Sequence, residues 1–379
     1  MVTKVRHGVT EREVARQYHV RLSTVQFWVE RAGDQRLDRV DWSSHPSGPH
    51  PSPELKDLVL QVRQELREHS VLGEYGAAAI HDELEHRPLT AVPSLRTLNR
   101  ILERRGALDR HRQPRRPAPP PGWYLPAVAD GRAELDLFDF VEDLAIQSGP
   151  LVDVLNVVGL HGGLVGSWPL AQQSARFVRD SVLAHWRVWG LPGYAQFDNA
   201  TVFQGPHQHP DAIGSVIRCC LSLGVTPVFV PPREMGFQAA IEGYNGRWQA
   251  KVWQRFHHAS LAELCMRSAA YVAAHCQRTV ARREAAPERR PFPKRWTLNL
   301  QAPLHGTIVF LRRTTADGQV SLLGHTYDVS STWVPCLVRG EVDLDAGAIR
   351  FFALRRRAPD QQPLLREVPY TVLRRRFRE

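Results

Sequence analysis

The sequence GYAQFDNATVF occupies residues 193–203 and joins a short apolar run to a polar end. The run 193–197 has the composition of a buried strand, and Asp198 and Asn199 follow it directly. Around it, the residue patterns predict strands over 134–141, 150–158, 163–168 and 225–230, and helices over 171–189, 211–222 and 236–258. Three adjacent strands followed by alternating helices and strands predict a mixed α/β sheet flanked by helices, in a domain over residues 131–283.

Three acidic residues occupy defined places on these predicted elements. Asp136 lies inside the first strand between apolar neighbours, Asp198 follows the fourth strand, and Glu242 lies in the helix over 236–258. A carboxylate in an apolar strand is costly to bury without a partner, and this strand contains no Lys or Arg. Carboxylate oxygens suit Mg²⁺ or Mn²⁺, and two such ions can activate an attacking hydroxyl and stabilise a leaving oxygen in phosphoryl transfer.

A strand Asp, a post-strand Asp-Asn and a helical Glu, in this order, resemble the D,D-E catalytic core of the retroviral-integrase superfamily, specifically its bacterial insertion-sequence transposases. Residues 193–203 are similar to the second-Asp segment of that family. Residues 231–248, PPREMGFQAAIEGYNGRW, are similar to its proline-introduced helix, in which an Asn follows the Glu by three residues. The resemblance implies a ribonuclease-H-like core in which Asp136, Asp198 and Glu242 hold two Mg²⁺ or Mn²⁺ ions.

Two departures from the family pattern leave these carboxylates in place. Ala200 stands where the family usually has Gly, and the segment between Asp198 and Glu242 is longer than usual. The first carboxylate has an alternative, because Asp139 lies three residues after Asp136 and strand alternation points the two to opposite faces. Asp136 fits the family pattern of an apolar residue, Asp and a second apolar residue better, so we favour it and keep Asp139 as the alternative first metal ligand.

The same resemblance implies contacts with nucleic acid near the carboxylates. Asn199 would orient Asp198 or contact nucleic acid. Asn245, Arg247 and Lys251 would meet the phosphate backbone from the catalytic helix.

Two helical modules are predicted before the core. Residues 1–33 resemble the helix-turn-helix found at the head of many bacterial transposases and regulators, with Thr10 and Glu13 forming a capping box. Its second helix would place Thr24, Gln26 and Arg31 on DNA. A plain helical hairpin is the alternative.

Residues 52–106 predict a second helix-turn-helix, with helices over 53–69, 76–86 and 94–105. Arg96, Asn99 and Arg100 are its candidate DNA contacts, although this basic face could simply be solvated. Residues 107–130 are rich in Pro and Arg and predict a semi-extended linker. Five strand-like runs after residue 300 predict a small β-barrel with a basic tail over 300–379.

Composition narrows the classes of protein further. The chain has 379 residues and a formal net charge of +10, with the Lys and Arg surplus in the flanks and a slightly acidic centre over 131–260. Five cysteines form no Cys-x-x-Cys pair, which argues against a zinc ribbon. No apolar run reaches the roughly 18 residues needed to cross a bilayer, and the N-terminus is too polar for a signal peptide. We therefore expect a cytoplasmic, bacterial protein that is nucleoid-associated when bound to DNA.

These observations predict a DNA transposase that binds the terminal repeats of its element and catalyses phosphodiester hydrolysis and strand transfer. Pairing of two DNA ends implies a homo-multimer on double-stranded DNA, while an accessory ATPase cannot be derived from the sequence. No glycine fingerprint for dinucleotides and no phosphate-binding P-loop occurs. The alternatives are a transposase-derived DNA-binding regulator without catalysis and a ribonuclease-H-like nuclease.

Overall fold

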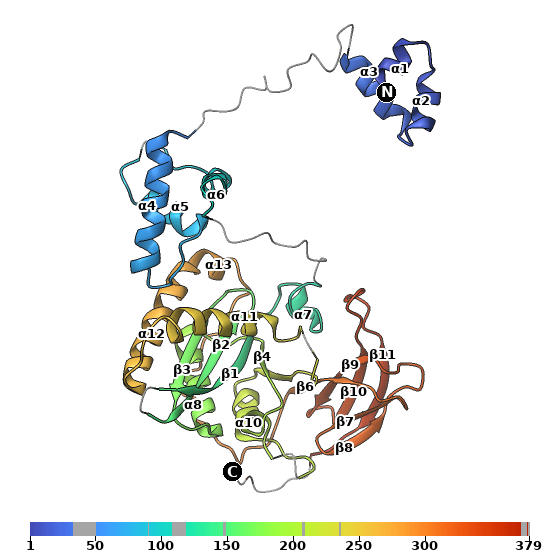
Figure 1. Ribbon diagram of the computed structural model, residues 1–379. Coiled ribbons are helices and arrows are strands. Elements are labelled where there is room, and N and C mark those ends of the chain that lie inside the picture. Colours follow the sequence, from blue (N-terminus) through green and yellow to red (C-terminus); the bar gives the residue numbers. More distant parts are fainter. Residues whose placement is uncertain are drawn as a thin grey trace.

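The structure, a computed structural model, describes residues 1–32, 51–89, 91–107, 119–146, 149–206, 209–234, 236–372 and 377. Residues 108–118 of the predicted linker and the last arginines of the basic tail, Arg374, Arg375, Arg376 and Arg378, lie outside the described residues. Within them, the chain forms two helical modules and a large α/β unit (Figure 1). No described helix is long and apolar enough to cross a membrane.

The first module consists of three short helices, α1 (Val2–Arg6), α2 (Glu11–Gln17) and α3 (Leu22–Ala32). The Thr10 side chain accepts a hydrogen bond from the backbone N–H of Glu13, so the predicted N-cap of α2 is present. Helix α1 was not predicted. Val14 and Val25 are fully buried between these helices and form a very small core.

The second module contains α4 (Pro53–His69), α5 (Ala77–Glu85) and α6 (Leu95–Arg104). Ser52 and Ser94 cap α4 and α6, and Pro53 occupies the first turn of α4, where its missing N–H costs no hydrogen bond. Seven buried aliphatic residues from the three helices form the core of this module, Val59, Val62, Ile80, Leu84, Leu98, Ile101 and Leu102.

The predicted mixed sheet begins with β1 (Leu135–Ala145), β2 (Leu151–Gly159), β3 (Val165–Leu170), β4 (Tyr194–Phe197) and β5 (Thr226–Phe229). The first three strands are antiparallel, and β4 and β5 continue the sheet from β1 in parallel. The resulting order is β3-β2-β1-β4-β5, a mixed sheet as predicted. It places the carboxyl ends of β1, β4 and β5 at one edge, where ligands of such sheets usually bind.

Helices cover both faces of this sheet. A short helix, α7 (Pro126–Ala129), comes before β1 in the chain. The helices that follow are α8 (Ala175–Trp189), α9 (Thr201–Gln204), α10 (Ser215–Ser222), α11 (Ala239–Trp248), α12 (Leu261–Arg278) and α13 (Val280–Glu284). A π-helical turn, η3 (Gln249–Trp253), continues α11. Phe138 of β1 packs with Trp186 of α8 in one core, whereas Leu137 packs with Tyr244 of α11 in the other. Neighbouring residues of β1 therefore face opposite layers.

The C-terminal strands differ from the predicted small barrel. They are β6 (Thr307–Arg313), β7 (Gln319–Leu322), β8 (His325–Asp328), β9 (Leu337–Asp343), β10 (Ala348–Ala353) and β11 (Leu364–Pro369). Among the described residues, β6, β9, β10 and β11 extend the core sheet to nine strands in open order, and β7 and β8 form a separate hairpin. The reason lies in β6, which pairs in parallel with β5 and buries Val309 in one core and Phe310 in the other.

Candidate active site

Asp139 is the carboxylate of β1 that faces the helix carrying Glu242. Its Oδ2 accepts a hydrogen bond of 2.8 Å from Nδ2 of Asn245 on α11, whose Oδ1 accepts one of 2.8 Å from Asn156 on β2. Asp139 and Asn156 are direct partners in the sheet register. Asn156 is fully buried and Asn245 nearly so. Asn245 fixes the orientation of Asp139, because its amide is held between Asp139 and Asn156. The Oδ1 of Asn156 is itself buried without a hydrogen-bond partner among the described residues.

Asp139 lies close enough to Asp198 and Glu242 for their charges to act on it. Burial raises the pKa of Asp139 to about 7, and the charges of Asp198 and Glu242 contribute to the rise. Burial also raises the pKa of Asp198, whose Oδ1 accepts a 2.9 Å hydrogen bond from the backbone N–H of Ala200. None of the three carboxylates forms an ion pair with a Lys, Arg or His among the described residues. Neighbouring carboxylates with no basic partner are a donor set that a divalent cation stabilises, so these residues fit Mg²⁺ or Mn²⁺.

Asp136, which the sequence favoured as the first ligand, lies on the opposite face of β1. Its carboxylate is fully buried and forms a two-point ion pair with the guanidinium of Arg289, with Nη1 at 3.1 Å from Oδ2 and Nη2 bonded to Oδ1. Nε1 of Trp186 donates a further hydrogen bond of 2.9 Å. Asp136 is thus separate from the carboxylate cluster, because its charge is balanced by an arginine 153 residues away in sequence. The alternative residue, Asp139, is the one next to Asp198 and Glu242.

Asn199 is held by its own neighbours. Its Nδ2 donates to the carbonyl of Val230 at 2.7 Å, and its Oδ1 accepts from Nη2 of Arg312 at 2.9 Å. The loop after β4 is thereby tied to the end of β5 and to β6. Arg312 was not a candidate from the sequence, since its place beside Asn199 depends on the β5–β6 pairing, which no local pattern indicates.

The two basic candidates on α11 and its extension η3 differ in environment. Arg247 is exposed on α11. Lys251, on η3, instead donates to the carbonyl of Gly73 at 2.7 Å and lies 5.3 Å from the centre of the Tyr75 ring. Lys251 therefore contacts the second helical module within the chain.

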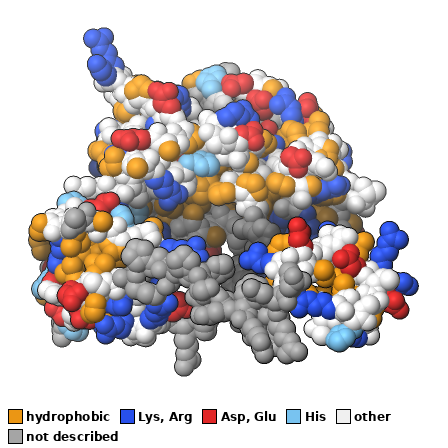
Figure 2. All heavy atoms as spheres, turned by 90° about the horizontal axis from the view of Figure 1, so that it is seen from above, with side chains coloured by type: hydrophobic (Ala, Val, Ile, Leu, Met, Phe, Trp, Pro, Cys, Tyr) orange, Lys and Arg blue, Asp and Glu red, His pale blue; other side chains and the backbone are white. Residues whose placement is uncertain are grey.

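The candidate DNA contacts of the helical modules lie mostly at the surface. Gln26, Arg31, Arg96, Asn99 and Arg100 are exposed, and Thr24 is half-buried. Phe27, beside them on α3, is 53% exposed, which is unusual for a large aromatic residue. Figure 2 shows Lys and Arg side chains spread over the visible face, with Asp and Glu side chains between them.

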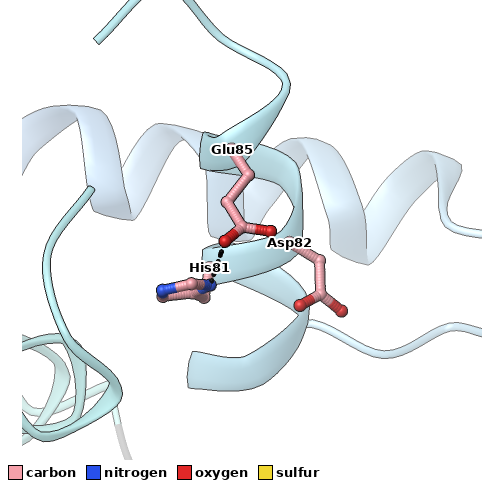
Figure 3. Close-up of side chains that lie close together, drawn as sticks. All are labelled: His81, Asp82 and Glu85. Atoms are coloured by element: carbon pink, nitrogen blue, oxygen red, sulfur yellow. Dashed lines mark ion pairs between the residues drawn. The ribbon is translucent and has the colours of Figure 1, made fainter. Parts of the chain in front are cut away.

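A different group has the tightest ligand geometry among the described residues. The ligand atoms of His81, Asp82 and Glu85 on α5 lie within 4.8 Å of one another (Figure 3). His81 and Glu85 form an ordinary pair one helical turn apart, and Asp82 lies 3.5 Å from Nη2 of Arg278. This surface cluster is explained by its ion pairs. Two ions held about 3.5–4 Å apart, by contrast, do not require all of their carboxylates to meet at one point.

No family model matches the chain, and a search of curated proteins found no significant match. Among solved structures, similarity is found to the catalytic core domain of BIV integrase, with 14% identity, 37% of this chain and 81% of that chain covered, and a TM-score of 0.28. The simian T-cell lymphotropic virus intasome, in complex with a PP2A regulatory subunit, is similar with 15% identity and a TM-score of 0.33, over 82% of this chain and 98% of that chain. The HTLV-2 integrase catalytic core domain in complex with magnesium is similar with 12% identity and a TM-score of 0.27, over 35% of this chain and 81% of that chain. Similarity at this level carries no argument about what this chain does.

Proposed function

We propose that the chain is a DNA transposase of the D,D-E type, with Asp139, Asp198 and Glu242 as its metal-binding carboxylates. The observation that carries the proposal is that Asp139 in the middle of β1 lies within the electrostatic reach of Asp198 after β4 and Glu242 on α11, with no basic ion-pair partner for the three among the described residues. Mg²⁺ or Mn²⁺ held there would activate the attacking hydroxyl and stabilise the leaving oxygen of a phosphodiester.

The surrounding residues would prepare this site. Asn156 and Asn245 orient Asp139, while the backbone N–H of Ala200 orients Asp198. The exposed Arg247 would bind the DNA backbone from α11. The helical modules would bind the element ends through the exposed residues of α3 and α6. The protein would act as a homo-multimer on double-stranded DNA.

The test uses the full chain with Mg²⁺ and a labelled duplex carrying the DNA that flanks its coding sequence. Wild type should cleave the element ends and join them to a target duplex. Asp139→Asn, Asp198→Asn and Glu242→Gln should each lose both activities and still bind the duplex. Asp180→Asn is the matched control, because Asp180 is an exposed carboxylate on α8 with only a weak pair to Arg176.

The outcomes separate the alternatives. Wild-type protein that binds the ends but never cleaves them would be a DNA-binding regulator. Cleavage of an RNA–DNA hybrid in preference to duplex DNA would identify a ribonuclease-H-like nuclease. Equal activity in wild type and all three carboxylate variants would exclude this cluster as the catalytic site.

A further inference from the structure

A cavity of about 250 Å³ lies beside Asn199, at the sheet edge where β4 and β5 end. It is open to solvent on one side and is lined by segments from distant parts of the sequence, namely the loop after β4, the start of the segment leading to α11, strand β6 and the β7–β8 turn. Its wall includes Asn199, Pro206, His209, Pro232, Arg312 and Gly324. None of the described lining residues is acidic.

Arg312 brings a positive charge to this cavity without a counter-charge. Among the described residues it has no carboxylate within 4.0 Å, whereas Arg289 and Arg339, which are also buried, each pair with one. The next residue on the strand, Arg313, pairs with Glu234. Burial lowers the pKa of Arg312 to about 10, which still leaves the guanidinium protonated at neutral pH.

The hydrogen bonds of Arg312 leave one edge of its guanidinium available. Nη1 donates to the carbonyls of Val230 at 3.2 Å and Leu311 at 2.8 Å, and Nη2 donates to Oδ1 of Asn199 at 2.9 Å. A guanidinium carries five N–H groups, so the Nε–H and one Nη2–H have no partner among the described residues. These two groups share one edge, and such an edge matches two oxygens of a phosphate.

We propose that this cavity receives a backbone phosphate of the bound DNA, held by the free edge of Arg312, next to the phosphodiester at Asp198. The proposal rests on the proposed DNA-strand-transfer function. DNA is the source of the phosphate because Asn199, which Arg312 holds, directly follows Asp198 in the chain. Near three carboxylates that repel DNA, a fixed cation supplies the local attraction that the backbone needs.

The phosphate would also be linked to the catalytic loop. A phosphodiester bound on one edge of Arg312 favours the arrangement in which the other edge holds Asn199 and Val230. Arg312 would thus act both as a DNA contact and as a positioning residue for the loop that carries Asp198.

The experiment measures binding of the full chain to a duplex carrying the element end, in EDTA so that no cleavage occurs. Single phosphates around the cleaved bond are replaced, one at a time, by uncharged methylphosphonates. For wild type, one position near the cleaved bond should weaken binding several-fold. In Arg312→Gln this position should no longer matter, and the slope of log affinity against log salt should become less steep by about 0.9, the value for one lost phosphate contact.

Two further variants complete the design. Arg313→Gln is the matched control and should keep the wild-type profile, because Arg313 is already paired with Glu234. Arg312→Lys keeps the charge but cannot bind two oxygens side by side, so its penalty at that position should fall only in part. If Arg312→Gln does not fold, as judged by its thermal melting, the Lys variant carries the comparison.

The results distinguish this inference from the proposed function. Identical methylphosphonate profiles and salt slopes in wild type and the Arg312 variants would overturn the inference, even if wild type processes DNA ends. Absence of end processing by wild type in Mg²⁺ would instead count against the proposed function. Loss of the position-specific penalty only in the Arg312 variants would support the phosphate site.

Discussion

Asp136 and Asp139 are three residues apart on one strand, yet their substitution should have opposite consequences. In Asp136→Asn, the buried Arg289 loses its counter-charge, and removal of one partner of a buried pair typically costs about 3–5 kcal/mol. In Asp139→Asn, repulsion with Asp198 and Glu242 is relieved, so the free energy of unfolding should be unchanged or higher. Urea denaturation measures both values. Equal destabilisation by the two variants would contradict the assignment of Asp136 to the interior and Asp139 to the site.

The same carboxylates predict a metal effect that does not depend on activity. A cation that binds only the folded protein raises its stability, by about 1.4 kcal/mol at a concentration ten times its Kd. Mg²⁺ should therefore raise the melting temperature of wild type and of Asp180→Asn by a few degrees. Asp139→Asn should show no such rise at matched ionic strength. A rise of the same size in Asp139→Asn would place the bound Mg²⁺ elsewhere.

At the scale of elements, the π-helical turn η3 and the residues after it connect α11 to the second helical module. Lys251 donates to Gly73, and Arg255 donates to the carbonyls of Ser70 at 2.5 Å and Glu68 at 3.1 Å, near the C-terminus of α4. Cations at a helix C-terminus are favourable because the unpaired carbonyls there carry partial negative charge.

Loss of these contacts should release the end of α4. In Lys251→Ala/Arg255→Ala, amide hydrogen exchange over residues 66–75 should accelerate about tenfold, which corresponds to the ~1.5 kcal/mol expected for one charged hydrogen bond. Lys294→Ala, at an exposed position, is the control. Unchanged exchange in the double variant would mean that the module is held by other contacts.

Helix α8 places the imidazole of His185 against β1, beside Asp136. Burial lowers the pKa of this imidazole to about 4, although Asp136 at 3.9 Å opposes the change and Arg289 adds to it. The unfolded chain binds a proton near pH 6.5, so it gains protons before the folded state does as the pH falls.

The free energy of unfolding should therefore decrease as the pH is lowered from about 6.5 towards 4. The His185→Gln variant lacks this group, so the difference in stability between wild type and variant should shrink over that interval. Denaturation at several pH values measures the difference, and a constant difference would show that His185 has an ordinary pKa in the folded state.

For the molecule as a whole, the sequence predicted what depends on local pattern. Periodicity placed β1 to β5, α8, α10 and α11 close to where they lie. The places of Asp198 and Glu242 on these elements made them candidates, and Asn245 became one through the family resemblance. The different surroundings of Asp136 and Asp139 could not be predicted, because they depend on the ion pair of Asp136 with Arg289, which no strand pattern reveals. The predicted barrel is not confirmed for a related reason, since the neighbour of an apolar strand is decided by tertiary packing.

The continuous sheet predicts that the core and the C-terminal strands fold as one unit. Without β6, strand β5 would become an exposed edge, and both cores would lose buried residues, including Val309 and Phe310. Arg339 of β9 also donates to the carbonyl of Tyr124 at 2.8 Å, ahead of β1. A fragment ending at residue 299 should therefore aggregate or stay unfolded, whereas one spanning 119–379 should fold and unfold in a single transition. Circular dichroism and size-exclusion chromatography make the comparison, and a soluble, cooperatively folded short fragment would show that the core is independent of β6.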